Sequence, residues 1–141
     1  MVELNKRPEN AKFKIHARTI GKLSAKGRRN PQNAYVNELL DYKIIVLAQR
    51  NYWEDHYRLF EAMSGGAMVL SDPMLPLPKG LVDGTHLVVY DSIKSLKEKI
   101  IYYLEHRDER LRIAREGHKE TLLHHRTWHH MEDIFLNSEY P

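Results

Sequence analysis

Cysteine is absent from the 141 residues of this chain. The absence excludes a disulfide framework and any metal site built on thiolates. The sequence also has no apolar run approaching the roughly 20 residues that a membrane-spanning helix needs, and its first residues lack the apolar core of a signal peptide. We therefore expect a soluble, cytoplasmic protein without a transmembrane segment.

Internal repeats and low-complexity tracts are also missing, whereas apolar residues make up 42% of the chain. This composition argues against disorder, and the length suits one domain with a real core. We expect a flexible basic arm over residues 1–12, one folded domain over residues 13–137 and a short tail over residues 138–141.

Positive charge gathers near the amino terminus. Residues 1–30 hold nine Lys or Arg against two Asp or Glu, a net charge of +7, whereas the remaining residues hold thirteen against seventeen, a net charge of −4. A basic segment of this kind could face phosphates, acidic lipid or nucleic acid. A solvated basic arm with no specific partner explains it equally well.

Alternating apolar and polar residues predict a strand over residues 13–17, and apolar runs predict three more, over residues 43–48, 67–71 and 86–90. Helical spacing predicts helices over residues 34–40 and 57–64 and another from about Asp108. Ser92 is predicted to cap a helix with an apolar stripe from Ile93 to Leu104. A last amphipathic helix is predicted from Thr127, with an apolar face of Trp128, Met131, Ile134 and Phe135. Strands that alternate with helices predict an α/β fold: a Rossmann-like parallel sheet flanked by helices.

Residues 57–72 are the most informative segment, because they read as a helix, a glycine stop and a buried strand that ends in two polar residues. Ligands of open α/β sheets bind at the carboxyl ends of strands and the amino ends of helices. This arrangement predicts that Tyr57, Arg58 and Glu61 lie at the edge of a binding crevice. His56, just before the helix, is a further candidate, although a lone histidine is more often simply solvated.

Several short motifs, taken in their order along the chain, indicate a more specific class of protein. They are the "R-x-F-E-A-x-x-x-G" segment from Arg58 to Gly66, the Asp83-Gly84 turn, the "L-x-x-K-I-x-Y-Y-L"-like helix from Leu96 to Leu104, the "R-x-x-I-A-x-x-G"-like segment ending at Gly117, and the final His125-Arg126-Thr127-Trp128. Together they resemble the carboxy-terminal, donor-binding domain of GT-B fold glycosyltransferases of the group 1 type.

The resemblance implies the C-terminal half of a GT-B glycosyltransferase, which moves a sugar from a nucleotide-sugar donor to a glycan, lipid or protein acceptor without an obligatory metal or other cofactor. It implies that Glu61 holds ribose hydroxyls through its carboxylate and that Arg58 meets the diphosphate. Glu54 resembles the first acid of the family's paired glutamates, although six residues separate it from Glu61, whereas seven are usual in the family.

Residues 21–27 resemble the family's phosphate-contacting "G-R-L-x-x-K-G" motif, although they lie much closer to the glutamates than in the relatives. They are either a basic loop or a compressed phosphate site, in which Lys22 and Lys26 would contact phosphate. The chain also looks too short for the complete enzyme, so we expect a missing N-terminal lobe or a homodimer, and we assign no catalytic base.

Two alternatives remain. The basic segment favours a non-catalytic α/β module that binds a protein partner or an anionic polymer. His125 and His129, one helical turn apart, have the spacing of a zinc site, but the match to the family's last helices favours a structural role. We therefore expect no metal.

Overall fold

The computed structural model describes residues 37, 39–48 and 57–136. The chain divides into two units, Met1–Gln32 and Asn33–Pro141, and all described residues belong to the second. The predicted arm and the predicted strand over residues 13–17 lie outside the described residues. Of the predicted helix over residues 34–40, the described positions Asn37, Leu39 and Leu40 are helical.

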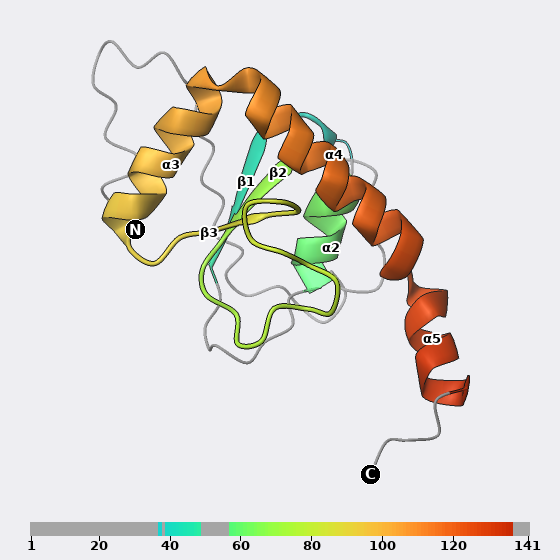
Figure 1. Cartoon of the computed structure of the whole chain (residues 1–141). Coiled ribbons are helices and arrows are strands. Elements are labelled where there is room, and N and C mark those ends of the chain that lie inside the picture. The colour runs from blue at the N-terminus through green and yellow to red at the C-terminus, as the bar shows by residue number, and fades with distance from the viewer. Residues whose placement is uncertain (1–36, 38, 49–56, 137–141) are drawn as a thin grey trace, which may run out of the picture. The chain divides into compact units, whose positions relative to one another are not determined.

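Three parallel strands form the sheet of the described residues (Figure 1). They are β1 (Ile44–Leu47), β2 (Met68–Ser71) and β3 (Val88–Val89), hydrogen-bonded in the order β1-β2-β3. Ile44 pairs with Met68, and Leu70 pairs with Val88. The predicted parallel α/β architecture is therefore confirmed, with β2 central among the described strands.

The third strand is shorter than the predicted range of residues 86–90. The chain before it folds into a turn, in which the Val82 N–H donates to His86 Nδ1 at 3.0 Å and the His86 N–H donates to the Val82 carbonyl at 3.0 Å. Leu87 contributes only an isolated bridge to Asp83. Because this turn takes up the His86 N–H, the ladder with β2 begins at Val88.

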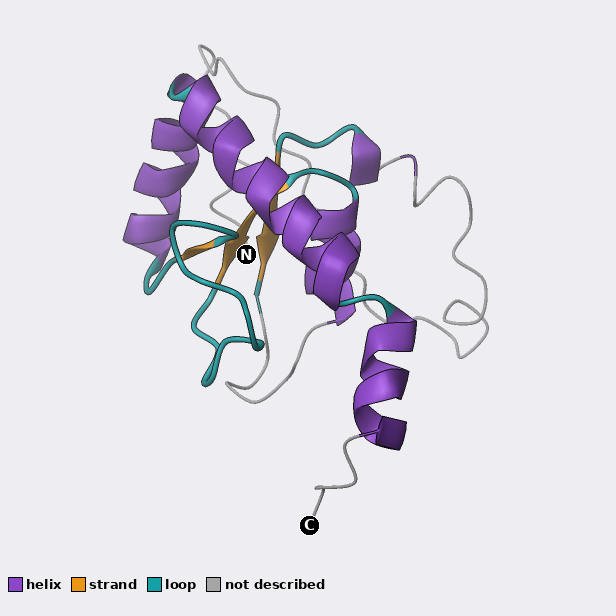
Figure 2. Ribbon diagram, turned by 45° about the vertical axis from the view of Figure 1, so that its right-hand side comes forward, coloured by secondary structure: helices purple, strands orange, loops and turns teal. Residues whose placement is uncertain are grey.

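Side chains of β2 alternate between two apolar clusters on opposite faces of the sheet, as the pleat of a strand requires. Val69 lies in a cluster with Leu59 and Met63 of α2 (Tyr57–Ser64). Met68 and Leu70 lie in a second cluster with residues of α3 (Ile93–Glu105) and α4 (Arg107–His124). Figure 2 shows the helices flanking the sheet, which makes a three-layer arrangement.

The helix boundaries agree closely with the sequence prediction. Helix α2 covers the predicted residues and ends in a turn with Gly66 at a φ of 77°, a left-handed conformation that glycine adopts without steric cost. Helix α3 begins after Ser92, whose hydroxyl accepts the Ser95 N–H at 3.1 Å and so confirms the predicted cap.

Helix α4 contacts α2, α3 and β2. Its Ile113 and Ala114 belong to the α3 side of the sheet, whereas further along the helix a ring nitrogen of His118 lies 3.2 Å from the Met63 carbonyl of α2. Gly117 lies directly against the backbone carbonyl of His86, and an added Cβ would also come within 2.9 Å of Met63 Cε. A hydrogen atom in place of a side chain therefore allows α4 to approach this closely.

The last helix, α5 (Thr127–Leu136), forms as predicted, but its apolar residues are exposed. Trp128, expected to pack, is 50% exposed and lies beneath the Arg126 guanidinium at 4.7 Å. Of the adjacent Tyr102 and Tyr103 on α3, Tyr103 is buried, whereas Tyr102 is exposed, with its ring stacked on His106 and its hydroxyl donating to Glu109 at 2.8 Å. Among the described residues, no helix is both long and apolar enough to cross a membrane.

Candidate functional site

The carboxyl ends of the three strands share one edge of the sheet, because the strands are parallel. Main-chain hydrogen bonds continue beyond the strands at this edge: the Asp72 N–H donates to the Leu47 carbonyl at 3.3 Å, and the Tyr90 N–H donates to the Ser71 carbonyl at 2.8 Å. Ligands of open α/β sheets bind outside this edge. It is therefore the candidate site.

Helix α2 begins at the same edge. It connects β1 to the neighbouring parallel strand β2, so it runs back from the carboxyl end of β1 toward the amino end of β2. At its far end, the turn at Gly66 leads to the Met68 N–H, which donates to the Lys43 carbonyl at 3.2 Å. The first N–H groups of a helix lack partners within the helix and favour negative charge.

Two of the predicted site residues lie on the described part of α2. Arg58 is in its first turn and Glu61 is one turn further, and both are partly buried. Tyr57 is the first residue of the helix, but its side chain is outside the described part. The other four predicted residues, Glu54, His56, Lys22 and Lys26, lie outside the described residues.

Tyr90 was not among the predicted site residues, yet it lies at this edge. Its side chain is only 7% exposed, and its hydroxyl donates to the Leu47 carbonyl at 2.8 Å. Burial, together with the negative charge of Asp72, raises the pKa of Tyr90 to about 12. The available signal was its position, since it is the last residue of the strand predicted over residues 86–90.

Ser71 is the last residue of β2, and Asp72 follows it directly at the centre of the edge. Ser71 is fully buried, and its hydroxyl donates to the Asp72 carbonyl at 3.0 Å. The Asp72 carboxyl is partly buried and close enough to influence Tyr90 electrostatically. The sequence showed these two polar residues at the end of the strand, although it did not mark them as binding residues.

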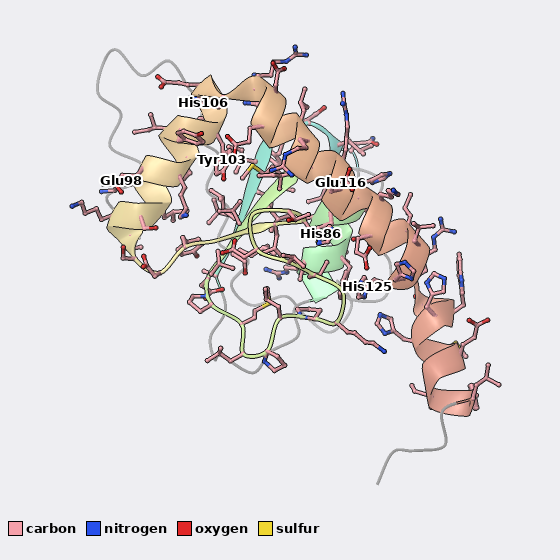
Figure 3. The ribbon with its side chains drawn as sticks, in the orientation of Figure 1. His86, Glu98, Tyr103, His106, Glu116 and His125 are labelled. Atoms are coloured by element: carbon pink, nitrogen blue, oxygen red, sulfur yellow. The ribbon has the colours of Figure 1, made fainter. Side chains whose placement is uncertain are left out.

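Phe60, next to Glu61, joins α2 to the region between α4 and α5. Its ring stacks on His125 with centroids 4.5 Å apart and lies 6.2 Å from the ring of His130. Figure 3 shows His125 at the end of α4. Gly80, in the loop between β2 and β3, also lies near His125: a Cβ atom added at Gly80 would be 3.9 Å from His125 Nε2. Aromatic packing therefore holds α2 against the end of α4.

Within the part of the chain that the structure describes, no group of three His, Asp or Glu residues is arranged to hold a metal ion. At the described edge lie the Asp72 carboxyl group and the first N–H groups of α2, and the same helix carries Arg58 and Glu61. A carboxylate can accept two hydrogen bonds from neighbouring hydroxyls, and the cationic and N–H groups can bind an anion.

Comparison with known proteins gave one family match. A family model described as "glycosyl transferase-like" matches residues 1–135. Neither the comparison with curated proteins nor the comparison with solved structures found a match.

Proposed function

Because the chain belongs to the glycosyl transferase-like family, we propose that it binds the nucleotide-sugar donor of a glycosyl transfer reaction at the carboxyl edge of its sheet. The observation that carries the proposal is the position of Arg58 and Glu61 on α2, the helix that starts at this edge. The family supports glycosyl transfer in general, and the geometry supports the donor side of that reaction.

Glu61 would hold the ribose of the donor. A carboxylate accepts hydrogen bonds from two neighbouring hydroxyl groups at once, and such charge-assisted bonds are stronger than neutral ones. Glu61 is partly buried, so water competes less with the ribose for its oxygens than it would at a fully exposed carboxylate.

Arg58 and the first turn of α2 would hold the diphosphate. Guanidinium groups match the geometry of phosphate oxygens, and the amino end of a helix adds N–H donors and a favourable dipole. In the transfer step, an acceptor hydroxyl forms a bond to the anomeric carbon and gives its proton to a general base, the bond from that carbon to the diphosphate breaks, and negative charge grows on the diphosphate. Arg58 and the helix end would stabilise that charge without a metal.

Titration calorimetry with nucleoside diphosphates and nucleotide-sugars tests the donor site. We expect saturable binding of one nucleotide class, and a Kd raised at least tenfold in Glu61→Ala, a loss of about 1.4 kcal/mol. The matched control is Glu98→Ala, which removes an exposed glutamate from α3 (Figure 3) and should leave the Kd unchanged.

Two results would contradict the donor site: no nucleotide binds the intact chain, or Glu61→Ala binds it as tightly as Glu98→Ala does. Steeply salt-dependent binding to nucleic acid, without any response to nucleotides, would instead favour the basic module suggested by the charge of residues 1–30.

A further inference from the structure

Tyr90 joins the ends of all three described strands. Directly after β3, its main-chain N–H donates to the Ser71 carbonyl of β2 at 2.8 Å. Its side chain reaches past β2, where the hydroxyl donates to the Leu47 carbonyl of β1 at 2.8 Å. Tyr90 therefore bonds the last residue of each of the other two described strands, Ser71 of β2 and Leu47 of β1.

Leu47 is the residue at which the chain leaves β1 on its way to α2. Its carbonyl oxygen accepts two hydrogen bonds, from the Tyr90 hydroxyl and from the Asp72 N–H at 3.3 Å. Its side chain lies in the same apolar cluster as Leu59, the neighbour of Arg58 on α2. The carboxyl end of β1 and the first turn of α2 thus pack into the same apolar cluster.

Burial makes the Tyr90 hydrogen bond difficult to replace. The hydroxyl lies in a side chain that is 7% exposed, so water cannot readily take its place, and a buried carbonyl that loses a partner costs free energy. The pKa of Tyr90, raised to about 12 by burial and by Asp72, lies far above physiological pH, so the hydroxyl is protonated there and can donate.

We infer that Tyr90 is a positioning residue for the donor site: its hydroxyl fixes the carboxyl end of β1 and, through it, the first turn of α2 that presents Arg58. Tyr90 itself does not contact the donor. This inference rests on the proposed function, because it assigns Tyr90 a role in the same site.

The variant Tyr90→Phe tests this role, because it keeps the buried ring and removes only the hydroxyl. We expect the Kd of the nucleoside diphosphate that binds the wild type to rise about three- to tenfold, measured well below the melting temperature. The matched control is Tyr102→Phe, which removes another tyrosine hydrogen bond of 2.8 Å, the one to Glu109 between α3 and α4. Tyr102→Phe should leave the Kd unchanged.

Amide hydrogen exchange gives a second readout that needs no ligand. The Asp72 N–H shares the Leu47 carbonyl with Tyr90, so its exchange should be faster in Tyr90→Phe and unchanged in Tyr102→Phe. A purely global loss of stability would instead speed the exchange of the protected core amides together.

The possible outcomes separate this inference from the proposed function. Wild-type affinity in Tyr90→Phe, or unchanged exchange at Asp72, would overturn the positioning role and leave the donor site standing. If no nucleoside diphosphate binds the wild type, the donor site itself is wrong, and the role of Tyr90 in it falls too.

Discussion

Two consecutive helices, α4 and α5, contradict what their compositions suggest. Helix α4 reads RDERLRIAREGHKETLLH and is mostly polar, yet five of its residues are buried. Helix α5 reads TWHHMEDIFL and is much more apolar, yet Ile134, Phe135 and Leu136 are 63%, 75% and 77% exposed. The comparison teaches that burial depends on whether a helix face can approach a partner, and not on its apolar content alone.

The buried face of α4 is built from small or compact residues at helical spacing. Ile113, Ala114, Gly117 and Thr121 lie on it, and Gly117 meets the backbone of the turn before β3. Arg110 is buried too, because its guanidinium donates to the Tyr103 carbonyl at 2.7 Å and to the Leu104 carbonyl at 3.3 Å. It thereby binds the carbonyls at the end of α3, where a cation is favourable.

Ile113→Ala should give the largest loss of stability. Ile113 is fully buried between α4 and the sheet, so its truncation leaves a cavity and lowers the free energy of unfolding by about 2–5 kcal/mol. Urea denaturation measures the change. A loss below about 0.5 kcal/mol, the size expected at the surface, would contradict the packed position of α4.

Gly117→Ala should give the next largest loss, about 1–3 kcal/mol, because the added methyl group meets the His86 carbonyl and Met63 Cε. Alanine is the better helix former, so propensity alone predicts a gain of about 1 kcal/mol. The control Arg115→Ala changes an exposed residue of the same helix and should be nearly neutral. A stabilised Gly117→Ala would mean that α4 lies farther from the turn.

Tyr90 should make the packed sheet edge sensitive to alkali. Its pKa is raised from 10.0 to about 12, so folding favours the protonated hydroxyl. That contribution to stability is complete below pH 10 and is lost as the pH rises through about 12. Thermal melts between pH 9 and pH 12 should therefore show a steeper fall in Tm for the wild type than for Tyr90→Phe. If the Tm of the two proteins fell equally with pH, the prediction that the Tyr90 hydroxyl is buried and has a raised pKa would be wrong.

Ile134→Ala should give the smallest effect. The side chain is 63% exposed on α5, so we expect the free energy of unfolding to change by less than about 0.5 kcal/mol. Ile134→Ala is the control for Ile113→Ala, because it removes the same atoms from the neighbouring helix. A loss similar to that of Ile113→Ala would show that another surface covers the apolar face of α5 in solution.

Local patterns predicted most of the described elements. The β-branched run before Leu47, the glycine stop after Ser64 and the Ser92 cap each act within a few residues, so they are readable in the sequence. The extent of β3 was not readable in this way. It depends on the hydrogen bonds between His86 and Val82, which withdraw the His86 N–H from pairing with β2.

The candidate site divides in the same way. The position of Arg58 and Glu61 on a helix next to a buried strand could be predicted, because helical spacing and the glycine stop are local signals, whereas their role in binding stays a prediction. Tyr90 could not be predicted, since its importance depends on a hydrogen bond to a residue 43 positions away. The Tyr57 side chain and the whole of Glu54, His56, Lys22 and Lys26 lie outside the described part of the chain, so even their positions stay predictions.

The sequence by itself determined the order of strands and helices, the parallel sheet and the helix that carries Arg58 and Glu61, because periodicity, caps and glycine stops are properties of short segments. Only the tertiary structure decided which helix faces are buried and how the strand ends are tied together. Those outcomes depend on close approach between distant residues, as at Gly117 and His86 or at Tyr90 and Leu47. Composition does not encode such contacts.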